Sequence, residues 1–141
     1  MRKQLILACA VSLSACATKP VSDTAAVPAP AERVFMYQSA VPDGGTLVVT
    51  RDVGLSGSAC DIGIMVDGQD VARLRTGERA TFNLPAGEVT LGAKPVGSGL
   101  CSIGTDRLRR ETGLIIKTGL VRKYRIGLGY SGEPVIAPTT Y

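Results

Sequence analysis

Apolar and polar residues alternate with a period of two through most of the chain after residue 33. Successive side chains of an extended strand point to opposite faces, so this alternation predicts strands with one buried face. The clearest case runs over 123–130, where Tyr124, Ile126, Leu128 and Tyr130 occupy the face expected to be buried. Other alternating segments predict strands at 62–66, 80–84 and 89–93, and shorter apolar segments predict strands at 34–38, 47–51, 71–74 and 114–117.

Turn-forming residues separate these segments. Asp67-Gly68 predicts a hairpin, because a type I′ turn needs positive φ angles. Pro85 opens a turn that ends at Gly87, Thr118-Gly119 precedes the final long strand, and 131–134 ends it. No run of ten residues has helical spacing, although 106–111 fits either one helical turn or a charged loop or strand edge. About eight or nine strands predict an all-β chain with a single small antiparallel β-sandwich.

Composition agrees with one small β domain. The chain has 141 residues, of which 17 are Gly and 8 are Pro, and its aromatic content of 4% implies an aliphatic core. It contains no His. This excludes Ser-His-Asp and Cys-His catalysis and the usual His-containing zinc sites.

The first residues resemble an export signal of bacterial lipoproteins. Arg2 and Lys3 precede an apolar stretch that is too short to span a bilayer. Leu13-Ser14-Ala15-Cys16 resembles a lipobox, which implies cleavage after residue 15, a diacylglycerol thioether on Cys16 and an acylated amino group. Ala17, in place of Asp, favours sorting to the outer membrane with the domain facing the periplasm. The alternative is an ordinary secretory signal in which Cys16 only falls near the cleavage point.

Cleavage would lower the formal net charge from +4 to +2 through loss of Arg2 and Lys3. A mildly basic mature chain gives no reason to expect a nucleic-acid partner. Residues 17–32 are rich in Ala, Pro, Thr, Ser and Val without an apolar face, so they predict a flexible tether. The expected organisation is therefore a signal peptide at 1–15, an anchor and tether at 16–32, and a β-sandwich at 33–141.

Two cysteines, Cys60 and Cys101, remain after Cys9 leaves with the signal and Cys16 carries lipid. In an oxidising periplasm such a pair is expected to form a disulfide, which by the chain-entropy account would stabilise the domain by roughly 4 kcal/mol. A redox-active pair and a two-thiol metal site are the alternatives. Neither cysteine belongs to a Cys-x-x-Cys motif, and no His completes a metal shell.

The middle of the chain resembles small bacterial envelope lipoproteins whose domain is related to PEGA-type surface modules. The residues that carry the resemblance are Ile64-Met65-Val66-Asp67-Gly68, Val71, Leu74, Gly77, Phe82, Leu84-Pro85-Ala86-Gly87 and Lys123-Tyr124-Arg125-Ile126. The resemblance covers about 34–136 and implies a PEGA-like or transthyretin-like β-sandwich without enzymatic activity. Cys60 and Cys101 depart from that pattern.

Candidate chemistry is sparse. Asp61, Asp67, Asp70 and Glu78 would form an acid–base pair only if folding brought them together, and no nucleophile elbow or phosphate loop occurs. No catalytic residue, cofactor or metal site is therefore expected.

A basic segment suggests a contact surface. Its cationic residues are Arg107, Arg109, Arg110, Lys117, Arg122, Lys123 and Arg125. If their strands are neighbours, they would form a patch for an anionic lipid or an acidic envelope protein. The simpler interpretation is a solvated sheet face whose charges discourage aggregation.

These observations predict a non-enzymatic outer-membrane lipoprotein that acts as a structural or interaction module. The alternative is a ligand-specific binder, such as an inhibitor of a cell-wall-degrading enzyme or an anionic lipid-binding accessory, that uses the cationic strands.

Overall fold

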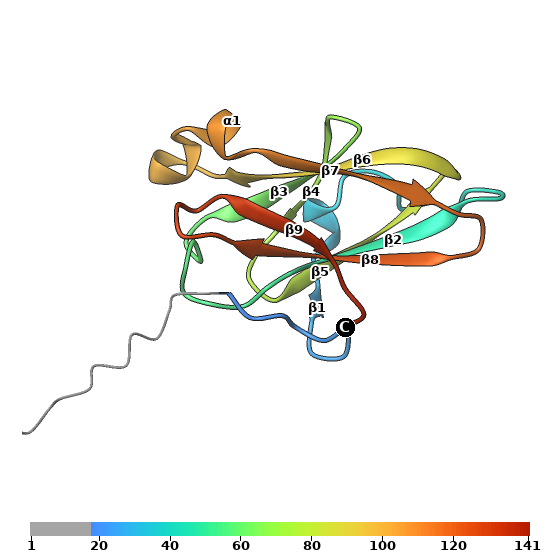
Figure 1. Ribbon diagram of the computed structural model, residues 1–141, viewed down its shortest axis with the longest axis horizontal. Coiled ribbons are helices and arrows are strands. Elements are labelled where there is room, and N and C mark those ends of the chain that lie inside the picture. Colours follow the sequence, from blue (N-terminus) through green and yellow to red (C-terminus); the bar gives the residue numbers. More distant parts are fainter. Residues whose placement is uncertain (1–17) are drawn as a thin grey trace, which may run out of the picture.

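Two β-sheets pack face to face in the computed structural model, which describes residues 18–141 (Figure 1). Within these residues the elements are β1 (Val27–Pro28), η1 (Ala31–Arg33), β2 (Gly45–Arg51), β3 (Asp61–Val66), β4 (Gln69–Leu74), β5 (Glu78–Leu84), β6 (Gly87–Val96), η2 (Gly99–Ser102), α1 (Thr105–Leu108), β7 (Arg110–Ile116), β8 (Val121–Leu128) and β9 (Pro134–Pro138). The predicted all-β sandwich is confirmed.

One sheet has the order β1-β5-β2-β8-β9 and the other β4-β3-β6-β7. Most neighbours are antiparallel, but β1 pairs with β5, and β2 with β8, in parallel. After β2 the chain crosses to the second sheet for β3 and β4, returns for β5, crosses again for β6 and β7, and comes back with β8, which runs parallel to β2. This arrangement decides which loops share an end of the molecule.

The core lies between the sheets and is aliphatic apart from Phe82. Leu47 and Val49 of β2 face it beside Phe82 of β5, and Ile62 and Ile64 of β3 close it from the opposite sheet. All five side chains are almost completely buried, and their alternate spacing explains why a period of two was visible in the sequence.

The Asp67-Gly68 turn joins β3 to β4 as predicted. Both residues have positive φ angles, 48° and 81°, which is the backbone that a type I′ hairpin requires. The Asp67 carboxylate also accepts a hydrogen bond from the Thr90 N–H at 2.8 Å, which fastens the turn to β6.

Other local predictions were wrong. Residues 34–38 do not form a strand: Val34 makes one isolated bridge with Ala72, and Tyr37 adopts a left-handed φ of 63° that interrupts an extended backbone. β9 was missed because prolines occupy both its ends, a pattern typical of edge strands. Tyr130 lies beyond the end of β8 in an exposed turn, so it does not belong to the buried face.

The prediction of a flexible tether does not hold for residues 18–32, because this segment packs against the five-stranded sheet. Lys19 and Val53 exchange two backbone hydrogen bonds of 2.7 and 3.0 Å, and β1 pairs with β5. Ala26 is buried. The sequence did not reveal this packing, because the segment is held by backbone pairing, which needs no alternating side chains. The signal peptide, Cys16 and Ala17 lie outside the described residues.

Cys60 and Cys101 lie at disulfide-bonding distance, with Cα atoms 5.4 Å apart. Cys60 immediately precedes β3, and Cys101 lies in η2 after β6. The pair therefore connects the loop that crosses between the sheets to the loop that follows β6.

Candidate functional site

The predicted cationic patch is divided between two sheets. Arg110 begins β7 in the four-stranded sheet, whereas Arg122, Lys123 and Arg125 lie on β8 in the five-stranded sheet. The patch required β7 and β8 to be neighbours, but β7 pairs with β6, and β8 pairs with β2 and β9. The condition for a single continuous patch is therefore not met, because segments close in sequence belong to different sheets.

Three of the seven cationic side chains form ion pairs. Arg109 Nε donates to Glu111 Oε1 at 3.0 Å, Arg125 Nε donates to Asp52 Oδ1 at 3.0 Å, and Lys123 pairs with Asp23. Arg110 is engaged differently, since its guanidinium donates to the backbone carbonyls of Arg107 and Arg109. Within residues 18–141, Arg107, Lys117 and Arg122 have no ion-pair partner.

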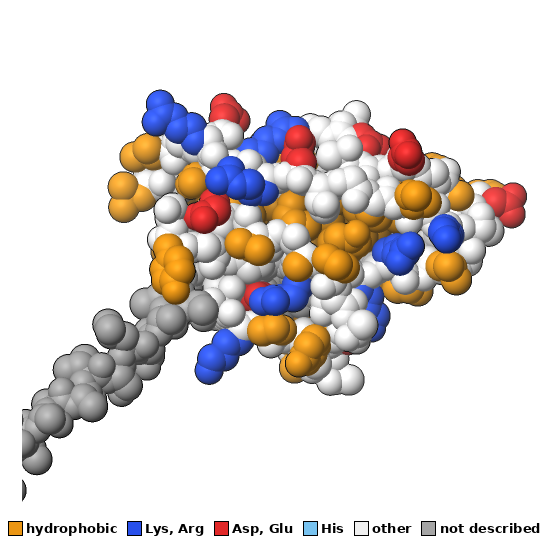
Figure 2. Space-filling view, in the orientation of Figure 1, with side chains coloured by type: hydrophobic (Ala, Val, Ile, Leu, Met, Phe, Trp, Pro, Cys, Tyr) orange, Lys and Arg blue, Asp and Glu red, His pale blue; other side chains and the backbone are white. Residues whose placement is uncertain are grey.

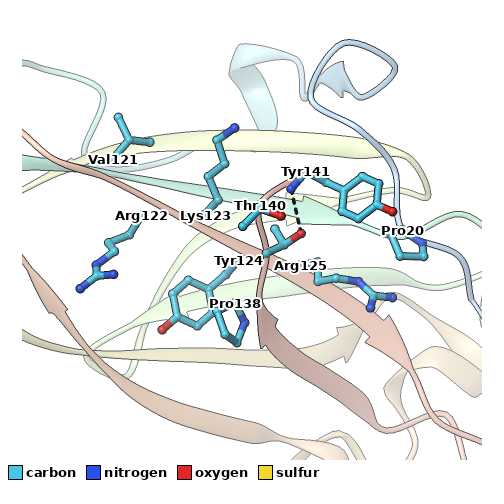
Figure 3. Close-up of a pocket in the computed structure, with 10 residues that line it drawn as sticks. Pro20, Val121, Arg122, Lys123, Tyr124, Arg125, Pro138, Thr140 and Tyr141 are labelled. Carbon is cyan, nitrogen blue, oxygen red and sulfur yellow. Dashed lines mark hydrogen bonds between the residues drawn. The ribbon is translucent and has the colours of Figure 1, made fainter.

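A groove of about 790 Å³ runs along the first half of β8 (Figure 3). It is lined by Pro20, Val121, Arg122, Lys123, Tyr124, Arg125, Pro138, Thr139, Thr140 and Tyr141. Figure 3 shows Arg122 and Tyr124 on one side of β8 and Lys123 on the other, as strand alternation requires. The groove combines the guanidinium of Arg122, which has no ion-pair partner within residues 18–141, with two tyrosines and two prolines.

The groove exists because β9 pairs only with the second half of β8 and leaves the first residues of β8 without a neighbouring strand of residues 18–141. Pro138, the last residue of β9, is opposite Tyr124, and the Thr139 N–H donates to the Lys123 carbonyl at 3.0 Å. Val121 and Arg122 pair with β2 on one side, and no strand of residues 18–141 pairs with them on the other. This short open edge could accept an extended peptide by strand addition, with Arg122 beside it for an acidic residue.

The cations that face the outer side of β8 hold the N-terminal segment in place. Asp52 is buried, and its carboxylate receives hydrogen bonds from Arg125 and from the Thr18 hydroxyl. The hydrogen bond to Asp52 raises the pKa of Arg125 above its ordinary value, and burial opposes it only partly. Lys123 and Arg125 therefore have structural partners, which leaves Arg122 as the groove's cation for a ligand.

Each of the four candidate carboxylates has a partner within the described residues. Asp61 lies 3.6 Å from Arg75 Nε, Asp70 lies 3.2 Å from Lys94 Nζ, and Glu78 pairs with Arg33. Asp67 fastens the β3–β4 turn, as described above. Among residues 18–141, no group of three or more Cys, Asp or Glu side chains is placed to hold a metal ion.

Sequence reasoning missed Arg51, a charged side chain that is only 1% exposed. Its guanidinium donates to the carbonyls of Cys60 at 2.7 Å, Leu74 at 2.9 Å and Gly57 at 2.8 Å. Burial lowers its pKa from the ordinary value, although the charges of Asp61 and Glu78 oppose this. The available signal was its inward position in register with Leu47 and Val49, where an apolar residue was expected.

Comparison with known proteins gives no relative. No family model matches the chain, no curated protein matches its sequence, and no solved structure matches its fold. Between residues 18 and 141, the helices are all too short or too polar to cross a membrane.

Proposed function

We propose that this chain is a non-enzymatic lipoprotein of the outer membrane, anchored through lipid on Cys16, whose β-sandwich serves as a periplasmic interaction module. The observation that carries the proposal is the groove along β8, where Arg122 has no ion-pair partner within residues 18–141 and the neighbouring strand edge is open. The lipobox-like sequence supplies the anchor.

The chemistry of the groove favours an extended acidic segment of a protein as its partner. A guanidinium binds a carboxylate through two parallel hydrogen bonds, and Tyr124, on the same side of β8 as Arg122, offers a rigid amphipathic surface. Backbone groups of Val121 and Arg122 would pair with the partner's main chain. Such a site needs no enclosed cavity, because most of its affinity comes from edge pairing and one desolvated ion pair.

The anchor is tested by the intact mass of the protein purified from membranes, with and without reductant and thiol alkylation. We expect loss of residues 1–15, added acyl mass, and alkylation of Cys60 and Cys101 only after reduction. An unlipidated mass would contradict the anchor, and alkylation without reduction would contradict the disulfide.

The groove is tested by a photo-crosslinking amino acid placed at Val121 in the intact, membrane-bound protein. Val121 is exposed and lines the groove, whereas Ile115 is similarly exposed on β7 and serves as the matched control position. We expect a discrete protein adduct from Val121 that is lost when Arg122→Glu is added, and no such adduct from Ile115. Identical adducts from both positions, or an adduct indifferent to Arg122→Glu, would contradict the acidic partner.

A further inference from the structure

The most exposed large hydrophobic side chains of residues 18–141 lie in connections between strands. Leu55 is 91% exposed, Tyr130 87%, Leu100 86% and Ile103 67%. Leu55 lies between β2 and β3, Tyr130 between β8 and β9, and Leu100 and Ile103 in and after η2. Scattered exposed hydrophobic residues are ordinary, but four at the tips of loops that share one end of a domain indicate a contact surface.

The topology brings these loops to the same end of the sandwich. β2 and β8 are parallel, so both finish there, and β6 also finishes there because it is antiparallel to β3, which begins after the β2–β3 loop. Two contacts link these segments: Gly57 of the β2–β3 loop packs against Leu128, the last residue of β8, and Cys60 lies at disulfide-bonding distance from Cys101. Figure 1 shows the three connections gathered at one end, which we call the loop end.

The N-terminal segment meets the domain at this same end. The Thr18 hydroxyl accepts the Leu128 N–H at 3.1 Å and donates to Asp52, and Lys19 pairs with Val53. Cys16 is two residues before Thr18. Two residues of extended chain span at most about 7 Å. A lipid on Cys16 would therefore enter a bilayer beside the loop end, without a long tether to hold the domain away.

Internal contacts hold the loops of the loop end in place, so that their apolar tips stay exposed. Arg51 binds the carbonyls of Gly57 and Cys60, which fixes the β2–β3 loop from inside, and the Cys60–Cys101 pair links that loop to η2. Ordered apolar tips lose little conformational entropy when they enter a membrane interface. Figure 2 shows hydrophobic surface on the end from which the grey N-terminal residues leave.

The charges near these tips carry both signs. Arg107 of α1 has no ion-pair partner within residues 18–141, but Asp106 is its neighbour and Glu133 lies in the β8–β9 turn. Attraction to anionic headgroups therefore adds little, and apolar contact has to supply the interaction. This distinguishes the loop end from an electrostatic lipid-binding patch, whose contact would weaken with salt.

We propose that the loop end rests on the lipid surface that holds Cys16, with Leu55, Leu100, Ile103 and Tyr130 in the interfacial layer. This inference rests on the proposed lipid anchor. It gives the domain a fixed orientation: the open edge of the groove at Val121 and Arg122 begins β8, at the opposite end from Leu128, and so points away from the membrane. The lipid and the partner would then be bound at opposite ends of one rigid sandwich.

The chain contains no Trp, so a single introduced Trp reports membrane contact without background. The probes are Leu55→Trp and Leu100→Trp in two different loops, each in the full lipidated protein. Leu120→Trp is the matched control, because Leu120 is exposed in the β7–β8 turn at the far end of the molecule. The proteins are reconstituted in vesicles of phosphatidylethanolamine and phosphatidylglycerol, with or without bromine on the acyl chains.

We expect brominated lipid to quench most of the emission of Leu55→Trp and Leu100→Trp, and almost none of that of Leu120→Trp. High salt should leave the quenching unchanged. Equal quenching at all three positions, or none at the two loop-end probes, would overturn the proposal, and quenching abolished by salt would overturn its apolar basis. Circular dichroism on each variant establishes that the fold is retained.

The intact mass of the same samples separates this inference from the function on which it rests. If the protein carries no acyl mass, both the lipid anchor and the docking of the loop end are contradicted. If acyl mass is present but the loop-end probes are not quenched, the anchor is supported and only the docking is contradicted. Loss of the Val121 crosslink with quenching intact would instead contradict the partner-binding groove alone.

Discussion

Asp52 and Arg125 form an ion pair at the end of the five-stranded sheet in which the carboxylate is fully buried and the guanidinium is only partly exposed. Arg125 pairs in register with Thr50 of β2, and Asp52 follows the end of that strand. Because Asp52 also binds the Thr18 hydroxyl, one carboxylate joins β2, β8 and the first described residue of the chain. The pair therefore holds the N-terminal segment to the domain as well as stabilising the sheet.

Replacing Asp52 should cost stability and release the N-terminal segment. We expect Asp52→Ala to lower the free energy of unfolding by about 2–3 kcal/mol, since it leaves Arg125 without its partner but still able to reach water. Urea unfolding measures the loss, and hydrogen exchange at the Lys19 amide measures release of the segment. Asp70→Ala is the matched control, because Asp70 pairs with Lys94 at the surface and should cost less than about 1 kcal/mol. Equal losses for both variants would contradict the role of Asp52.

The Arg33–Glu78 pair predicts a specific loss of stability in acid. Burial alone would raise the pKa of Glu78, but hydrogen bonds from Arg33 and the Arg75 N–H together hold it below its ordinary value. A carboxyl group with a lower pKa in the folded state stabilises the fold above its unfolded pKa of about 4.3 and loses that contribution as the pH falls through the folded value. Glu78→Gln should therefore be less stable than the natural chain at pH 7.

Chemical denaturation at several pH values between neutrality and strong acid tests the Glu78 prediction. The difference in unfolding free energy between the natural chain and Glu78→Gln should be about 1–2 kcal/mol at pH 7 and should shrink below the ordinary carboxyl pKa. A difference that stays constant with pH would mean that the glutamate contributes through packing, without its charge.

Gly45 and Gly113 should respond differently to the same substitution. A Cβ on Gly45 would lie 2.4 Å from the Lys117 carbonyl oxygen, a backbone atom that cannot move aside cheaply, whereas a Cβ on Gly113 meets nothing within 4 Å. We expect Gly45→Ala to destabilise by about 2–3 kcal/mol and Gly113→Ala by less than about 0.5 kcal/mol. Thermal melts of both variants measure this. A neutral Gly45→Ala would show that β2 and the β7–β8 turn are packed less closely than described.

Side-chain alternation predicted the elements whose stability comes from burial on one face. Ile62, Ile64 and Phe82 appear at the expected positions because each contributes to the core directly. β1 could not be predicted in this way, since its two residues are held by backbone pairing to β5 and both are exposed. Alternation also cannot show that Val48 and Thr50, on the face of β2 opposite Leu47 and Val49, are buried as well.

The sequence predicted some of the residues of the candidate site, but it did not predict how these residues are arranged in space. Arg122 and Lys123 were identified as contact residues, but their separation from Arg110 depends on the parallel pairing of β8 with β2, which joins strands about 75 positions apart in register. Local sequence carries no signal for such a long-range pairing. The groove also depends on where β9 ends, and β9 was not predicted.

Arg51 offers the sharpest test of how the loop end is held. Its guanidinium donates to two carbonyls of the β2–β3 loop and to the carbonyl of Leu74 at the end of β4, while its own charge has no ion-pair partner within residues 18–141. Arg51→Ala should lower the free energy of unfolding by about 3–4 kcal/mol, because it removes a charged donor from each of these carbonyls and opens a void. Arg51→Lys should recover part of the loss, since an ammonium retains the charge but lacks the planar fork of donors.

The position of Arg51 predicts where that loss is felt. Hydrogen exchange in Arg51→Ala should increase first in residues 52–60, because Gly57 and Cys60 lose their internal anchor, while the β5–β6 turn should keep its protection. Arg75→Ala is the matched control, because Arg75 is exposed and its contact with Asp61 is long at 3.6 Å. If 52–60 remained protected in Arg51→Ala, the disulfide-linked loop would be stable by itself, and the rigidity of the Leu55 tip would come from Cys60 and Cys101.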